Sequence, residues 1–505
     1  MKKNSLFKVI GIVILLYAVM SFIIPVSSTY GVLTDLSTSP INFFRVLGTI
    51  FESFGGFSSL LVFVLLVGAF YSILNATGVY KRYVTSIANK FKGKEKIFLA
   101  VVMVLIAIIS SVAGLEMELF FIFPLLISII LVMGYDKLVA LSATFGATVI
   151  GMYGATFAGT LYNVNNQVLD ISVYDGIWIK VLLLVLGTAL LVWYTLFNAK
   201  KTNEKVKAVV KEAKSDKKST TKGKAKKAAL EVKEIVVDEV KEDIFLSDIT
   251  DKKEKSNRKT WPITLIIGLI MVILILGSID FQSIFGGNWF NTLNTDLTNL
   301  TIGDYPIWDN LLGGFASFGT WFTPYRFQYA SMILIVGTLI LSIVYRVGLS
   351  DSFDAYVEGI KKYSKPAVLV VLACSVFVLT YYYPVFTTAG SWIMSLTSSF
   401  NVATSSLFSF LGGVFYVDIY YYSYYALSYL GTVAGDAALS PLVSIMFVNM
   451  YSLAMLIAPT SVMLLSSLSI TDTSYPKWIK YIWKLFVILA VLSLAVFAVY
   501  YFVVR

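Results

Sequence analysis

The sequence is dominated by apolar runs of about twenty residues, the length that crosses the hydrocarbon core of a membrane as a helix. The clearest runs occupy residues 6–26, 57–77, 177–198, 261–280, 327–347 and 481–503. Charged residues make up only 14% of the 505 residues, whereas soluble domains carry about 25%. The pattern therefore predicts an all-α polytopic membrane protein whose main partner is a lipid bilayer. The first run resembles a signal peptide, but it is long and has no small-x-small cleavage site, so we expect an uncleaved helix.

The placement of lysine and arginine predicts the orientation, because these residues concentrate in cytoplasmic loops. Residues 80–96 and 200–260 are basic and should be cytoplasmic, together with the N-terminus. The segment Asp280–Tyr325 contains no Lys or Arg, and 27–56 carries few charges, so both should be external. We expect a multi-pass protein of a bacterial plasma membrane.

The basic segment also divides the chain. Residues 200–259 hold 19 Lys and Arg against 12 Asp and Glu, so seven of the ten net positive charges lie there. A composition rich in Lys, Ser and Thr is typical of a disordered cytoplasmic linker. This clustering reflects topology, so we expect no nucleic-acid partner. The linker, 200–260, separates an N-terminal membrane half, 1–199, from a C-terminal half, 261–505.

Each half contains unusual segments after its first spans. Short apolar arms within 97–134 flank a tip with glycine and acids, which predicts a hairpin that enters and leaves on one side. A segment rich in glycine follows at 138–167 and indicates a broken helix. The second half repeats the order, with a hairpin at about 384–434 and a broken helix at about 441–468.

The breaks are expected to expose backbone groups inside the membrane. Gly151–Asn166 and Asn449–Ser461 should be unwound, which is tolerated only where the backbone is buried or lines a cavity. If the basic segments 200–260 and 477–484 are both cytoplasmic, the two broken helices cross in opposite directions. This arrangement predicts two inverted repeats that meet at a midplane substrate site. The alternative is that every segment spans fully and that the glycines are packing contacts.

Three acidic residues lie within apolar surroundings. Glu116 and Glu118 sit at the first hairpin tip, where they would bind a coupling ion, a cationic substrate or a proton. The structural alternative is that they pair with a lysine and hold the hairpin. Asp418 lies among seven tyrosines between 416 and 429, which suits an ammonium or guanidinium group, although an interfacial aromatic belt gives the same pattern.

Other chemistries are excluded by composition. The chain has no histidine and a single cysteine, Cys374, so imidazole relays and disulfides within the chain are impossible. Walker, HExxH and dinucleotide-binding motifs are absent. We therefore expect neither an enzyme nor a protein that needs a cofactor or a metal site. The sequence is compatible with a coupling ion, either sodium or a proton.

Several blocks resemble a known family. Gly114–Glu118, Phe123-Pro124-Leu125 and Gly134-Tyr135-Asp136, with Ala458–Ser461 and Tyr475–Lys480, are similar to motifs of the C4-dicarboxylate anaerobic carrier-like (YfcC/DcuC-type) transporters. The resemblance implies the ion transporter superfamily, with inverted repeats and re-entrant hairpins, and a family that includes arginine–ornithine exchangers and carboxylate carriers. The chain departs from the motifs at 155–160 and 165–167, and these departures put the substrate in doubt more than the fold.

The leading hypothesis is a secondary transporter of a small amino acid or related organic ion, with basic amino acid exchange favoured by the excess of intramembrane acids. A C4-dicarboxylate carrier coupled to sodium or protons is the alternative, and a channel or membrane scaffold is a third possibility. A homodimer is compatible with the sequence. The candidate substrate or coupling-ion site comprises Gly114, Glu116, Glu118, Thr156, Thr160, Asn163, Asn166, Asp418, Asn449, Pro459, Thr460 and Ser461.

Overall fold

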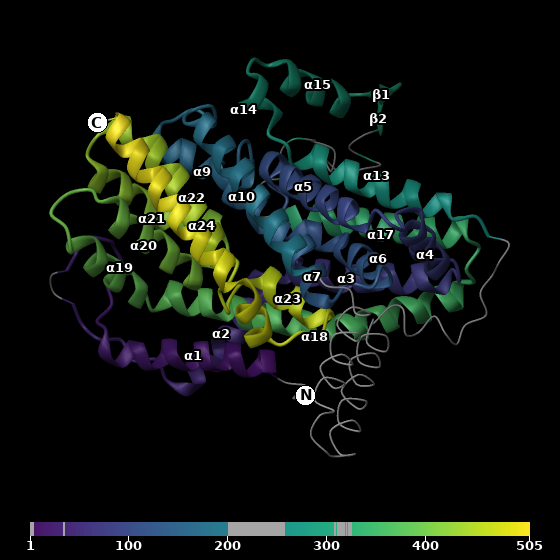
Figure 1. The fold of residues 1–505 in the computed structure, drawn as a ribbon, viewed down its shortest axis with the longest axis horizontal. Coiled ribbons are helices and arrows are strands. Elements are labelled where there is room, and N and C mark those ends of the chain that lie inside the picture. Colours follow the sequence, from purple (N-terminus) through teal and green to yellow (C-terminus); the bar gives the residue numbers. More distant parts are fainter. Residues whose placement is uncertain are drawn as a thin grey trace, which may run out of the picture.

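The computed structural model describes residues 5–33, 36–199, 258–307, 310, 319, 321 and 326–504. Most of the predicted linker, 200–257, lies outside the described residues. The described part is an elongated bundle of helices (Figure 1). It is an all-α polytopic membrane protein, as the sequence predicts.

Nine helices among the described residues are long and apolar enough to cross a membrane. Each of the six clear runs in the sequence coincides with one of them. They are α1 (Ser5–Ile23), α3 (Ser58–Ala76), α5 (Glu95–Ala113), α10 (Ile177–Asn198), α13 (Trp261–Ser278), α17 (Arg326–Val344), α18 (Leu349–Tyr382), α22 (Ser440–Met455) with the short turn before it, and α24 (Tyr475–Val504).

Short elements connect these helices. Two of them, β1 (Thr301–Ile302) and β2 (Tyr305–Pro306), form a small antiparallel ribbon in which Thr301 lies opposite Pro306. The short helices outside the hairpins and broken helices are α2 (Phe43–Gly56), α4 (Tyr80–Lys90), α14 (Phe281–Phe285), α15 (Trp289–Thr298) and α19 (Val385–Ser395).

The first hairpin consists of α5, a 3₁₀ turn over Met117–Phe121 and α6 (Phe123–Val132). Helix α5 ends at Gly114, whose φ of +68° is a conformation that glycine adopts without strain. A Cβ at Gly114 would also lie 2.3 Å from the Thr160 hydroxyl. Glycine therefore shapes the tip and allows a second element to approach it.

The second hairpin consists of α20 (Val402–Phe415) and α21 (Ile419–Ala434), joined by three residues. It is shorter than the predicted 384–434, because α19 is a separate helix and the Asn401 side chain caps a new helix start by accepting from the Ala403 amide. Figure 1 places α20 and α21 towards one end of the long axis and α6 towards the other.

A broken helix follows each hairpin. The first comprises α7 (Lys137–Leu141), a π-helical turn over Ser142–Gly146 and α8 (Ala147–Tyr153), and after a gap it resumes as α9 (Gly159–Leu169). The second comprises α22 and α23 (Val462–Ile470), separated by residues 456–461. Hairpin, broken helix and a closing span, α10 or α24, thus occur in the same order in both halves.

The unwound stretches are shorter than the sequence analysis predicts. Asn163 and Asn166 belong to α9, and Asn449 lies within an uninterrupted α22, so the expectation of unwound backbone there is wrong. Asparagine is a weak helix former, but burial and a side-chain partner override its propensity at Asn449. Gly151 does not break its helix either. It is a close-packing contact, where a Cβ would lie 2.5 Å from the Ala107 carbonyl oxygen.

Helix α18 is the longest element and packs along α3. It begins at Leu349, and hydropathy alone detects only its apolar second half, because its first half is rich in polar and charged residues. The two helices meet at Gly68 and Gly359, where a Cβ on Gly359 would lie 2.3 Å from the Gly68 carbonyl oxygen. Two glycines therefore let the backbones touch, as small residues do in membrane helix pairs.

We predict that Gly359→Ala separates α3 from α18 and destabilises the protein by about 1–3 kcal/mol, the range for an overpacked core. Thermal unfolding of the detergent-purified variant measures this effect. Gly268→Ala in α13 is the matched control, because a Cβ there has no atom within 4 Å. Equal melting temperatures for the two variants would contradict the proposed contact.

Candidate functional site

Arg326, the first residue of α17, joins carboxylates from both hairpin tips. Its Nη2 lies 3.3 Å from Glu116 Oε2 and 3.5 Å from Asp418 Oδ2, and its Nε lies 3.3 Å from Glu118 Oε1. Glu116 and Glu118 belong to the first tip, and Asp418 belongs to the second. The three acids singled out from the sequence therefore meet at one arginine; we call these four residues the ion cluster.

The ion cluster is almost closed to solvent. The side chain of Glu118 is 3% exposed and that of Arg326 is 8% exposed. Glu118 Oε2 also accepts from the Glu116 backbone N–H at 3.0 Å, and Asp418 caps α21 by accepting from the Tyr420 amide at 2.8 Å. Each tip is thus folded around a carboxylate that also binds Arg326.

The charges of the ion cluster do not balance. Three carboxylates face one guanidinium, so the fully ionised group carries two negative charges in excess. Glu116 Oε1 is buried and has no hydrogen-bond partner among the described residues. Buried charge of this kind is costly within a membrane, and a bound cation or proton would lower the excess.

A cavity of about 80 Å³ adjoins the ion cluster. This volume is smaller than the roughly 150 Å³ of an engineered cavity that binds benzene. The arrangement therefore encloses space for water or an ion, and a larger organic solute requires the tips to separate. Its walls include Glu116, Arg326 and Asp418, the aromatic residues Phe57, Phe327, Tyr421 and Tyr451, the methionines Met117, Met152, Met455 and Met463, and Ser461.

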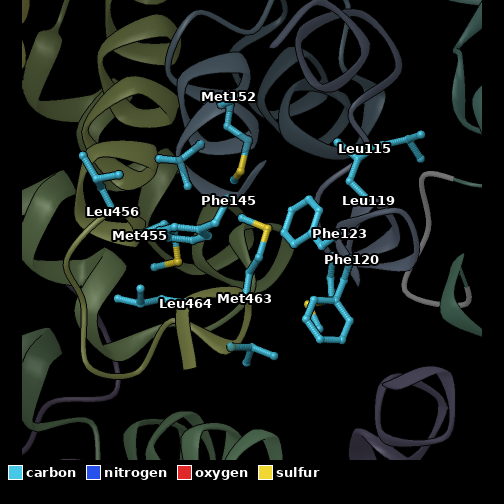
Figure 2. Close-up of a cluster of buried hydrophobic side chains, with 14 of the residues drawn as sticks. Leu115, Leu119, Phe120, Phe123, Phe145, Met152, Met455, Leu456, Met463 and Leu464 are labelled. Carbon is cyan, nitrogen blue, oxygen red and sulfur yellow. The ribbon is translucent and has the colours of Figure 1, made fainter. Parts of the chain in front are cut away.

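An apolar cluster borders the cavity. Figure 2 shows Met152, Met455 and Met463 from separate elements, with Leu115 and Phe120 of the first hairpin nearby. All five residues are buried. Methionine is unbranched and fills irregular space, so such a boundary adapts when a neighbouring element moves.

Hydroxyl groups fasten each tip to the broken helix of its own half. In the first half, Thr160 Oγ1 donates to the Gly114 carbonyl at 2.8 Å, and the Thr156 amide donates to the Ser111 carbonyl at 3.0 Å. In the second half, Thr460 Oγ1 donates to the Val414 carbonyl at 2.5 Å. The predicted threonines thus support the tips, and the same type of contact recurs in both halves.

Asparagines tie the two broken helices to each other. Asn449 Nδ2 donates to the Tyr153 carbonyl at 2.8 Å, at the end of α8, while its Oδ1 has no partner among the described residues. Asn165 Nδ2 donates to Ser444 Oγ at 3.2 Å. The Asn449 side chain therefore satisfies a carbonyl group that the first break leaves without a helical partner. The sequence pattern does not indicate this hydrogen bond between the two halves.

The other predicted residues lie in different places. Ser461 lines the central cavity and caps α23 through the Leu464 amide, and Pro459 lies in the second break. Asn163 and Asn166 instead line a separate open cavity of about 430 Å³ beside Asp170 and Asp280. The structure thus brings the three acids and Ser461 together, whereas the two α9 asparagines lie apart from them.

The tyrosines near Asp418 do not form a cage around it. Tyr421 lines the central cavity, but Tyr416 and Tyr422 are buried and stack on each other with centroids 4.8 Å apart. Tyr424 is 64% exposed. Tyr451, which lines the cavity together with Tyr421, belongs to α22.

Two buried cations were missed in the sequence. Arg326 stands at the boundary between a loop and an apolar run, where a basic residue resembles an ordinary interfacial anchor. Lys180 lies inside α10, is 2% exposed, donates to the Val173 carbonyl at 2.9 Å and lies 4.0 Å from the Tyr162 ring centroid. An intramembrane base is the signal that would have identified Lys180, whereas Arg326 gives no such local signal.

Comparisons with known proteins address the identity of the chain. An uncharacterised protein of Haemophilus influenzae is 28% identical over 141 residues, a stretch that spans 28% of each chain. The solved structure of the Alcanivorax borkumensis YdaH transporter aligns over 99% of this chain and 98% of its own, with 13% identity and a TM-score of 0.39. The family model described as C4-dicarboxylate anaerobic carrier matches residues 49–502. The chain therefore belongs to the C4-dicarboxylate anaerobic carrier family.

Proposed function

We propose that this transporter carries a small amino acid with a cationic side chain, in exchange for a related ion. The observation that supports the proposal is the ion cluster, in which three carboxylates from two hairpin tips face one guanidinium beside a cavity. A substrate with one carboxylate and two cationic groups complements this distribution of charge.

The electrostatic argument concerns the excess negative charge. A cation that enters the ion cluster lowers the excess, and Glu116 Oε1 is a free acceptor for an N–H donor. The α-carboxylate of an amino acid would pair with Arg326, and its ammonium or guanidinium would pair with the acids. Tyr421 and Tyr451 line the same cavity and offer ring faces to a cation.

Arg326 also suggests how the substrate is coupled to movement. Its guanidinium is a tethered cation that holds both tips together when the cavity is small. A cationic substrate competes with Arg326 for the same carboxylates, so its binding would release the tips from each other. Such release between two repeats is the kind of change that alternating access requires.

The alternative is transport of a C4-dicarboxylate, which the description of the family favours. In that case Arg326 would bind a substrate carboxylate, and Glu116, Glu118 and Asp418 would bind sodium or protons. We rank it second, because the guanidinium already contacts three carboxylates and a dianion would enter a site with excess negative charge.

Substrate uptake separates the two proposals. We predict that proteoliposomes loaded with ornithine accumulate radiolabelled arginine, whereas empty liposomes and liposomes loaded with succinate do not. Uptake of succinate without uptake of arginine would reject the cationic substrate and favour the dicarboxylate.

We predict that Glu118→Gln reduces transport to background while the protein still inserts in the membrane, because an amide cannot balance Arg326 or a substrate cation. Uptake is measured per amount of purified protein, after size-exclusion chromatography has verified folding. Glu358→Gln, which removes an acid from an exposed pair with Lys362, is the matched control and should retain activity. Full activity of Glu118→Gln would make the acid purely structural.

We predict that Arg326→Ala lowers stability by about 3–5 kcal/mol, because it leaves buried carboxylates without their cation. Millimolar methylguanidinium should raise the melting temperature of this variant more than that of the wild type. Arg45→Ala removes an arginine from a more exposed pair with Glu52 and should show no such rescue. An equal response of all three proteins would contradict a cation site at the ion cluster.

A further inference from the structure

We propose that a basic pocket at one end of α13 and α17 binds the phosphate of an anionic phospholipid. The pocket has a volume of about 320 Å³. It is lined by Arg258, Lys259, Trp261, Pro262, Val344, Tyr345 and Arg346. Three of these seven side chains are cationic and none is acidic, so the pocket suits an anion.

Two of the three cations in the pocket are available to a ligand. Lys259 and Arg346 have no ion-pair partner among the described residues, and both are exposed. Arg258 is anchored by its Nη1, which donates to the Thr77 carbonyl at 3.0 Å. The Tyr345 hydroxyl donates to the Lys259 carbonyl at 2.8 Å and joins the two helices at the rim. Hydrogen bonds to other segments therefore hold Arg258 and Lys259 in place.

The surroundings favour a lipid over free phosphate. Trp261 is 60% exposed and Val344 is 48% exposed, so the pocket is apolar on one side. Leu265 and Ile343, on the adjoining turns of α13 and α17, are 59% and 74% exposed and extend this apolar surface along the helices. A phosphate on the cations with acyl chains along these residues satisfies both parts of the surface.

The position of the pocket agrees with this ligand. Lysine and arginine placement predicts that this end is cytoplasmic, and the cytoplasmic leaflet is the one with negative surface potential. Arg326 lies at the opposite end of α17, and 19 helical residues span about 28 Å. The pocket is therefore separate from the ion cluster, and the inference does not depend on the identity of the transported solute.

Lipid binding to the purified full chain tests the proposal. We predict that phosphatidylglycerol, added to protein in neutral detergent, raises the melting temperature and stays bound in native mass spectrometry, while phosphatidylcholine and inorganic phosphate do neither. The double variant Lys259→Gln/Arg346→Gln should bind phosphatidylglycerol about tenfold more weakly. Lys90→Gln/Lys92→Gln, two exposed cations outside the pocket on the same predicted face, is the matched control.

Two outcomes overturn the proposal. One is equal retention of phosphatidylglycerol by both double variants, which would mean that the lipid contacts the surface elsewhere. The other is an equal gain in stability from inorganic phosphate alone, which would assign the pocket to a soluble anion. Because the native mass measurement counts bound lipid directly, it does not depend on a change in stability.

Discussion

The ion pairs between Arg326 and the carboxylates of two hairpin tips are the constraint on which the rest of the architecture depends. Charge within a membrane is tolerated only when it is sheltered and paired. The hairpin arms bring Glu116 and Glu118 from one side and Asp418 from the other, and α17 supplies the guanidinium between them. Among the described residues, one guanidinium faces three carboxylates, and this imbalance is the basis of the proposed cation site.

Single hydrogen bonds support the elements around the ion cluster. Hydroxyls of Thr160 and Thr460 hold the tips by single hydrogen bonds to carbonyl oxygens, and Asn449 takes a carbonyl left by the opposite break. Each bond has a modest net free energy, of about 1 kcal/mol. Close glycine contacts such as Gly68 with Gly359, in contrast, fix neighbouring spans against each other. Ion pairs and single hydrogen bonds thus hold the tips, whereas close backbone contacts join α3 and α18.

Methionine side chains line the cavity beside the ion cluster. Met152 of the first broken helix and Met455 and Met463 of the second lie beside the first hairpin. Methionine is unbranched and fills irregular space, so these side chains form an apolar boundary beside the ion pairs. The basic pocket at the far end of α17 adds a second contact with the membrane, on the same helix that carries Arg326.

The sequence alone indicates the six clearest membrane spans, the hairpin with Glu116 and Glu118 at its tip, and the unusual position of Asp418, because apolar length and misplaced charge are local signals. It did not determine which residues meet. Arg326 resembles an ordinary residue at the start of a span, and Asn449 lies in a helix where the sequence predicts a break. Of the two interpretations of the tyrosines near Asp418, the cage does not form. These outcomes depend on contacts between residues far apart in the chain, such as Arg326 with Glu116, and no local pattern encodes such contacts. Tertiary structure alone therefore decided that the three acids share one cation.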